Sequence, residues 1–108
     1  GLLAAPPDAL HSALAPLAPL LAALHAIAEA HGWSPATLAL GYGLRQRHLA
    51  AAVVGVDSLA RWQENLALLA AMPSYPQYDV ERMVLQPPPL PLACLLPVYW
   101  PPNPILQP

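Results

Sequence analysis

Apolar residues recur at helical spacing through the first third of the chain. Between Asp8 and Gly32 the intervals of three, four and one are those of one helix face. The recurring positions are Leu17, Leu20, Leu21, Leu24, Ile27 and Ala28. Pro16 and Pro19 would interrupt a continuous helix, but a proline suits the first turn of a helix. We therefore expect a helix over residues 19–30 that stops at Gly32.

A second helix is predicted directly after this glycine. Ser34 is a suitable N-cap and Pro35 suits the first helical position, so the helix should run to about Gln46. Gly41 and Gly43 each lower the helix propensity by roughly 1 kcal/mol relative to alanine. The sequence therefore predicts that a close packing neighbour supports this helix.

The centre of the chain changes character within a few residues. Residues 49–56, "LAAAVVGV", are apolar on both faces, which is typical of a parallel strand covered on both sides, although a buried helix segment has the same pattern. A helix over residues 59–71 is expected next. At 100 degrees per residue it separates an apolar stripe from a polar one. The apolar stripe contains Leu59, Trp62, Leu66 and Leu69, and the polar stripe contains Ser58, Arg61, Glu64 and Asn65.

The last third of the chain is rich in proline. Residues 72–78 are turn-like, and "DVERMVLQ" predicts a short helix capped by Asp79. The tail from Gln86 contains nine of the sixteen prolines and is expected to form neither a helix nor a central strand. Such a tail can dock on an aromatic groove of a partner, but its apolar residues favour packing over the body of a larger protein.

Composition narrows the function classes. Only 9% of the residues are charged and the net charge is -2, so the chain lacks the basic field that binds nucleic acid or anionic lipid. Cys94 is the single cysteine and no Cys/His cluster has metal-ligand spacing, which predicts no metal site and fits a reducing cytoplasm. Neither apolar helix is expected to offer the 20 uninterrupted residues that span a bilayer. The first residues, "GLLAAPP", include no initiator methionine and no basic leader, which suggests a fragment.

The polar stripe follows an apolar run and a glycine. A strand, a glycine and a helix N-terminus can together hold a phosphate, because free N–H groups and the helix dipole point at one place. Arg61 could add a planar cationic fork, Glu64 could accept from an exocyclic amine, and Asn65 could donate and accept. The alternative is that the stripe is only the solvated face of a helix with Ser58 as its cap.

A longer stretch resembles a known family. The run "LHAIAEAHGWSPATLALGYGLRQRHLAAAVVGVDSLARWQENLALL" is similar to the C-terminal region of the aldo-keto reductases, in which a strand ending in "VVGV" precedes a helix with "RWQEN". The likeness covers residues 1–75. It implies an α/β fold, namely the last helices and final strand of a (β/α)8 TIM barrel, mostly helical when seen alone, with an irregular proline-rich tail. The expected division is residues 1–78 for the barrel part and 79–108 for the short helix and tail.

The same resemblance implies a cofactor site. In aldo-keto reductases the loop after the eighth strand and the following helix bind the adenosine 2'-phosphate and adenine of NADP(H). The positions that match here are Gly55, Val56, Asp57, Ser58, Arg61, Glu64 and Asn65. Many members have lysine or serine directly after the strand, whereas Val56 and Asp57 follow here. Because Asp57 would oppose a phosphate, dinucleotide binding is predicted more firmly than a preference for NADP.

The chemistry of this family cannot be completed within the chain. Its carbonyl reduction uses an Asp, Tyr, Lys and His set in the first part of the barrel, and this sequence contains no lysine. The tyrosines and histidines are therefore predicted to be structural. The leading hypothesis is the C-terminal part of a cytoplasmic NADP(H)-dependent aldo-keto reductase, acting on a small carbonyl substrate only as an intact parent. The alternative is a small non-enzymatic helical interaction module with a proline-rich binding tail, which would bury residues 49–56 within itself.

Overall fold

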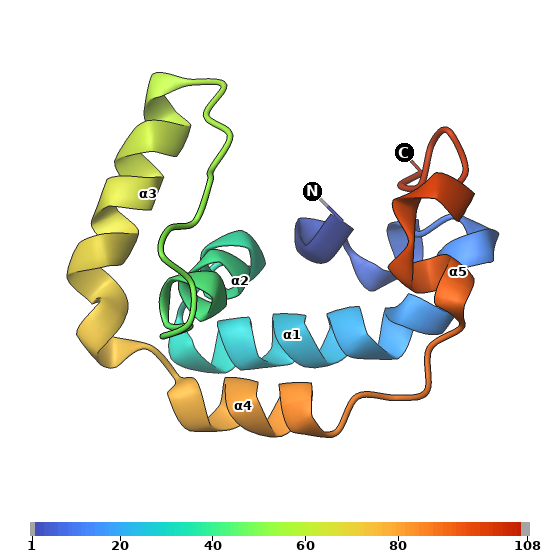
Figure 1. Cartoon of the computed structure of the whole chain (residues 1–108), viewed down its shortest axis with the longest axis horizontal. Helices are drawn as coiled ribbons and strands as arrows, with labels where there is room; N and C mark the ends of the chain where they lie inside the picture. Colours follow the sequence, from blue (N-terminus) through green and yellow to red (C-terminus); the bar gives the residue numbers. More distant parts are fainter. Residues whose placement is uncertain (1, 107–108) are drawn as a thin grey trace.

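Helices make up the architecture of the chain. The computed structural model describes residues 2–106 and contains, within them, five α-helices, five 3-10 helices and no β-strand (Figure 1). The α-helices are α1 (Ala18–His31), α2 (Pro35–Leu44), α3 (Leu59–Ala71), α4 (Gln77–Leu85) and α5 (Leu92–Leu95). The 3-10 helices are η1 (Leu2–Ala4), η2 (Pro7–Ala9), η3 (Ser12–Leu17), η4 (Met72–Ser74) and η5 (Pro97–Tyr99). Helices α1 and α4 form a base from which α3 rises at one end, and the C-terminal region lies at the other, while η1 lies above the middle of α1 and against α2.

Helix α1 confirms the first predicted helix. It is preceded by the six-residue 3-10 helix η3, which accommodates Pro16, and Pro19 lies in its first turn. Gly32 ends α1 in the left-handed conformation, with φ of 70°, and its N–H donates to the carbonyls of the last turn. A residue with a β-carbon adopts this conformation only at an energetic cost. Glycine at position 32 therefore favours the end of the helix here.

Helix α2 begins as its cap predicts. The Ser34 side chain accepts a hydrogen bond from the N–H of Thr37 at 3.1 Å. A β-carbon built on Gly41 would lie 2.5 Å from Cε2 of Tyr75, whereas one built on Gly43 would meet nothing within 4 Å. The expected packing neighbour is therefore confirmed for Gly41 only.

Helix α3 has the predicted bounds and very little tertiary packing. Ser58 caps it by accepting from the N–H of Arg61 at 3.2 Å. Leu68, 3% exposed, is its one buried residue. The apolar stripe of α3 remains 47–71% exposed and comprises Leu59, Trp62, Leu66 and Leu69. Both faces of this helix are therefore turned to solvent over most of its length.

The predicted strand is wrong, and with it the predicted fold class. Residues 49–56 form a non-helical connection between α2 and α3, and every one of them is exposed. Among the described residues no neighbouring strand exists with which they could form a ladder, and the single β-bridge joins Leu10 to Ile105 elsewhere. A β-strand is stabilised by backbone hydrogen bonds to a neighbouring strand, and these residues have no such neighbour. Residues 2–106 form a compact, mostly helical domain with five α-helices, and no fragment of a (β/α)8 barrel is evident in them.

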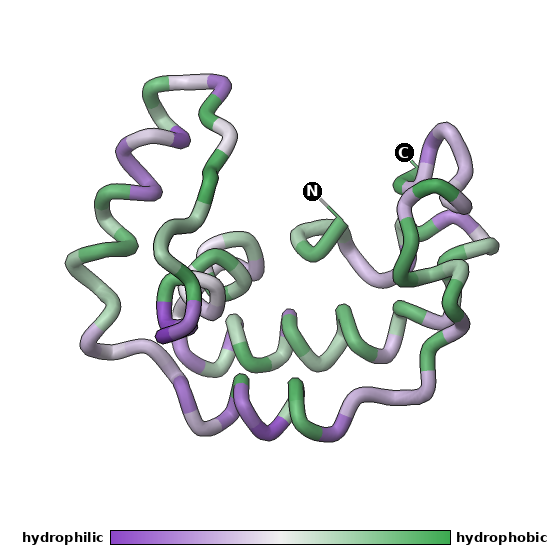
Figure 2. Tube along the Cα trace, viewed as in Figure 1, coloured by the Kyte–Doolittle hydropathy of each residue, from purple (hydrophilic) through white to green (hydrophobic). Residues whose placement is uncertain are grey.

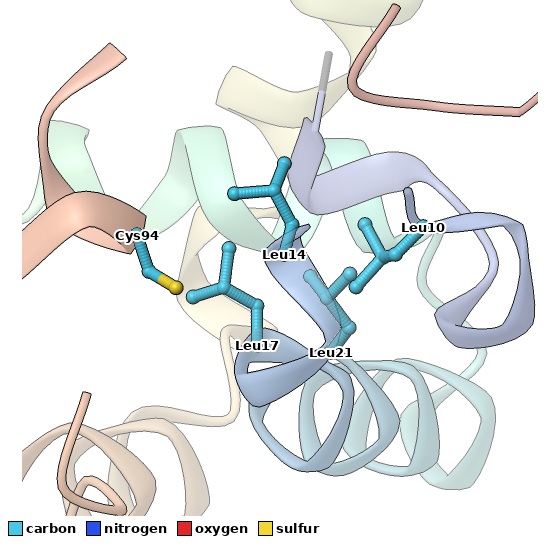
Figure 3. Packing of buried hydrophobic residues seen from close by; sticks show 5 residues of the cluster. All are labelled: Leu10, Leu14, Leu17, Leu21 and Cys94. Atoms are coloured by element: carbon cyan, nitrogen blue, oxygen red, sulfur yellow. The ribbon is translucent and has the colours of Figure 1, made fainter. Parts of the chain in front are cut away.

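The core is divided into two clusters that α1 connects. The first lies where η3 and the start of α1 meet α5 (Figure 3), and it consists of Leu10, Leu14, Leu17, Leu21 and Cys94. The second lies between α1, α2 and α4 and consists of Leu24, Ala28, Leu38, Tyr75 and Val80. Because α1 presents Leu21 to one cluster and Leu24 to the other, the two halves of the molecule share one helix.

The second cluster is organised around one aromatic ring. Tyr75 is 7% exposed, and its hydroxyl donates a hydrogen bond to the backbone carbonyl of Leu38 at 2.8 Å. Trp33 meets the ring edge to face, with centroids 5.4 Å apart, and the Arg45 guanidinium lies 5.7 Å from the ring centroid. These contacts fix the end of α2 against the turn that precedes α4.

The later elements differ partly from expectation. The short helix predicted at "DVERMVLQ" exists as α4, but it begins at Gln77, so Asp79 lies in its first turn rather than at its cap. Asp79 instead binds His31 at the end of α1, with Oδ2 and Nε2 2.8 Å apart. Two short helices, α5 and η5, interrupt the tail that was expected to be irregular. Both contain only three or four residues, which fit between the prolines.

The tail packs against the beginning of the same chain. The N–H of His11 donates to the carbonyl of Pro104 at 3.0 Å, and the N–H of Leu106 donates to the carbonyl of Ala9 at 2.6 Å. Trp100 packs against the first core cluster and donates through its indole nitrogen to the carbonyl of Cys94. The ends of the expected first part and tail, Gly1 and residues 107–108, lie outside the described residues.

The expectation that no segment reaches bilayer-spanning length needs correction. Ser12–His31, formed by η3 and α1 together, has 20 residues and contains an 18-residue window of mean hydropathy 1.6, which suffices by length and composition to cross a membrane. The prolines do not shorten it, because they lie in the 3-10 helix and the first α-helical turn. Its inward residues supply both core clusters, and 28% of its most apolar window is buried.

Candidate functional site

Five of the seven predicted cofactor residues border one hollow at the start of α3. The hollow has a volume of about 650 Å³. Its predicted members are Gly55, Val56, Asp57, Arg61 and Asn65, and Val54 lies beside them. Residues 54–57, in the connection between α2 and α3, form one wall of the hollow. The first two turns of α3 form the adjacent wall. Backbone groups and two charged side chains therefore face a common space.

The opposite wall comes from residues that the sequence did not indicate. Ala36 and Leu40 of α2 and Ala4 of η1 complete the lining. They are small or apolar residues with no chemical signature, and Ala4 is separated from α3 by more than fifty positions. Only the packing of α2 against η1 and α3 brings them here, so no local pattern could have found them.

The remaining two predicted residues lie at the margin. The Ser58 hydroxyl is engaged as the cap of α3 and does not line the hollow. Glu64 borders a second hollow of about 620 Å³, between the N-terminus of α2 and the face of α3, which also includes Arg61. Ala4, Ala36 and Arg61 border both hollows, and Arg61 is the charged side chain among them.

Arg61 and Glu64 form an exposed ion pair in which a ligand could replace Glu64 as the partner of the guanidinium. Nη1 of Arg61 lies 3.3 Å from Oε2 of Glu64, and the two side chains are 58% and 57% exposed. An exposed pair of this kind contributes about 0–1 kcal/mol. The guanidinium thus stays available to a stronger acceptor such as a phosphate, which it can grip with two parallel hydrogen bonds.

The charge of the hollow is mixed. Arg61 contributes a cation and the N-terminus of α3 adds a partial positive charge, whereas Asp57 contributes an anion on the same wall. An anion would therefore be held on the Arg61 side and disfavoured on the Asp57 side. The arrangement can bind and orient a polar ligand, and its residues offer no paired nucleophile and base.

The tyrosines and histidines occupy positions away from this hollow. Burial raises the pKa of Tyr75 to about 12, partly offset by the Arg45 guanidinium, and its ring belongs to the second core cluster. His31 is engaged with Asp79. Nε2 of His25 is buried, and within residues 2–106 it has no hydrogen-bond partner. None of these three side chains lines the hollow at α3.

No family model, no curated protein and no solved structure matches this chain. The likeness to aldo-keto reductases therefore rests on the sequence motifs quoted above.

Proposed function

We propose that this chain supplies the adenosine side of an NADP(H) pocket to an aldo-keto reductase whose catalytic groups lie outside it. The observation that carries the proposal is the hollow that gathers Gly55, Val56, Asp57, Arg61 and Asn65. These are the positions that the family resemblance assigns to the cofactor. The proposal rests on this binding surface, because the described residues show no fragment of the barrel that the resemblance implies.

Each side chain has a defined role in this proposal. The Arg61 guanidinium leaves Glu64 and grips the 2'-phosphate, while Asn65 hydrogen-bonds to the adenine edge. Glu64, released from its ion pair, accepts from the exocyclic amine of adenine. Gly55 leaves the wall of the hollow without a side chain, which lets the ligand approach the backbone.

The reduction itself is assigned to other residues. The family mechanism needs a lysine, and the chain has none. We therefore propose that the intact parent is a cytoplasmic enzyme that reduces a small carbonyl substrate, and that this chain alone binds dinucleotide without turning it over.

Arg61 provides the direct test. In the full chain, Arg61→Ala should weaken NADPH binding by about 1–3 kcal/mol, the range for a charge-assisted hydrogen bond. NADH should suffer less, because it lacks the 2'-phosphate. Isothermal titration calorimetry with both dinucleotides measures the difference. Arg82→Ala is the matched control, because Arg82 is an exposed arginine on α4 beside Tyr78, away from the hollow.

The outcomes separate the roles of Arg61. Equal losses for NADH and NADPH would show that Arg61 stacks on adenine rather than binding the phosphate. If neither dinucleotide binds the wild-type chain, or if Arg82→Ala weakens binding as much as Arg61→Ala, the proposed function is wrong.

The alternative function meets one of its structural expectations and misses another. The chain is compact and mostly helical, as a helical interaction module would be, but residues 49–56, which such a module should bury, are all exposed. Its proline-rich tail is also engaged, through Trp100 and residues 104–106, with the beginning of the same chain. The structure therefore offers no specific support for a tail that is free to bind partners.

A further inference from the structure

The connecting segment, residues 50–57, is a backbone without hydrogen-bond partners. No backbone hydrogen bond within residues 2–106 involves any of these eight residues. All are exposed, and Val53 is fully exposed at 102%. Figure 2 colours most of the segment as hydrophobic. An apolar, non-helical segment with free N–H and C=O groups is a template for strand pairing.

The segment exposes apolar side chains to solvent. Val54 and Val56 are 40% and 44% exposed, and Val53 is exposed completely. Apolar side chains gathered on an exposed segment are a feature of interaction sites in folded proteins. Residues 50–56 contain no charged or polar side chain, so the segment can pair with a copy of itself without burying a charge.

The charges that flank the segment decide its orientation. Arg47 precedes it and Asp57 ends it; both are exposed, and neither forms an ion pair in the described part of the chain. In an antiparallel pair of copies, the basic end of each segment lies beside the acidic end of the other. A parallel pair would instead place like charges together, which is destabilising.

We propose that two copies of this chain associate by antiparallel pairing of this segment about a two-fold axis at Ala52, a register that sets Arg47 of each copy opposite Asp57 of the other. Such an interface is isologous, so each favourable contact occurs twice. Main-chain hydrogen bonds supply the attraction, and the valine side chains bury apolar surface against the second copy. The inference does not depend on dinucleotide binding and is tested without cofactor.

Sedimentation equilibrium of the full chain over a concentration series tests the association. Wild type should show a reversible monomer–dimer equilibrium. Val54→Lys should raise the dimer dissociation constant about tenfold or more, because it places a charge within the paired strands. Val98→Lys is the control: Val98 is 81% exposed on η5, away from the segment, and its replacement should leave the equilibrium unchanged. Helical circular dichroism should be the same for all three proteins, because both valines are exposed.

A charge exchange tests the antiparallel arrangement. Arg47→Asp alone and Asp57→Arg alone should each raise the dissociation constant at least about fivefold, since each creates two like-charge contacts. The double variant restores opposite charges and should return to near the wild-type value. High salt should reduce these differences and leave the association itself in place.

Four results with the variants above would overturn the proposal, and a fifth comes from a variant on α3. The first four are a wild type that stays monomeric at all concentrations, a double variant that is no better than the single ones, assemblies that grow beyond a dimer, and a Val98→Lys effect equal to that of Val54→Lys. If Leu66→Lys on α3 abolishes the dimer while Val54→Lys does not, the helix stripe is the interface and strand pairing is wrong.

Discussion

Among single residues, Gly41 and Gly43 of α2 differ in whether the fold requires a glycine at that position. Gly41 faces the ring of Tyr75, with space for hydrogen only, whereas Gly43 faces open space. Gly41→Ala should lower the free energy of unfolding by about 1–3 kcal/mol through overpacking. Gly43→Ala should raise it by about 0.5–1 kcal/mol, because alanine is the better helix former.

Urea denaturation of both variants measures this contrast. Their midpoints should move in opposite directions from that of the wild type. Two shifts of the same sign would contradict the described packing of α2 against Tyr75. Sequence alone predicted that α2 needs a neighbour; it could not say which glycine meets it, because Tyr75 arrives from a distant turn.

Tyr75 also gives the fold a dependence on alkaline pH. Its pKa is raised from 10.0 to about 12, chiefly by burial, with the Arg45 guanidinium acting in the opposite direction. Because the folded-state pKa lies above the unfolded one, this stabilisation is fully present below pH 10 and is lost as the pH rises through 12. A shift of this size corresponds to about 3 kcal/mol.

Denaturation below pH 10 and near pH 12 measures the contribution of Tyr75. Tyr75→Phe removes the titrating hydroxyl and its hydrogen bond to Leu38. Relative to wild type, this variant should be less stable at neutral pH by about 1 kcal/mol and should lose less stability on raising the pH. An equal alkaline loss in both proteins would assign the pH dependence to other groups.

At the scale of elements, caps determine the helix boundaries and packing determines their stability. Ser34 caps α2 and Ser58 caps α3 in the same way. Each side-chain hydroxyl accepts a hydrogen bond from the backbone N–H three residues later. Helix α2 contributes the fully buried Leu38 to the core, whereas α3 buries only Leu68. Losing equivalent caps should therefore have different consequences.

Replacing each serine by alanine tests this difference. Ser34→Ala should lower the global free energy of unfolding by about 0.5–2 kcal/mol. Ser58→Ala removes a similar hydrogen bond, but its effect should remain local, as faster amide exchange in the first turn of α3 with little change in global stability. A global loss for Ser58→Ala as large as for Ser34→Ala would show that α3 is an integral part of the core.

The same distinction explains which elements could be predicted from sequence. Of the four predicted helices, α1, α2 and α3 were predicted with their ends because Ser34, Ser58 and Gly32 act on their own neighbours in the chain. The strand predicted at residues 49–56 is wrong, because an apolar run indicates only that a segment could be buried, and its partner strand would have to come from elsewhere in the fold. In the described chain no such strand exists, so the run stays an exposed connection.

At the scale of the whole molecule, the terminal segments determine the shape. Residues 9–11 and 104–106 meet through backbone hydrogen bonds, and Trp100 packs against the first core cluster. Proline content predicted that the tail would be irregular, but it could not predict where the tail lies. The same holds for the hollow at α3, whose far wall depends on Ala4, Ala36 and Leu40.

In the function that we propose, this hollow receives the adenosine end of NADP(H). A titration of the uniformly ¹⁵N-labelled full chain with adenosine 2',5'-bisphosphate, followed by two-dimensional NMR, tests this binding directly. Saturable shifts should be concentrated in residues 54–65, should be weaker with adenosine 5'-phosphate, and should be lost in Arg61→Ala. Shifts centred on another surface, or none at any concentration, would contradict it.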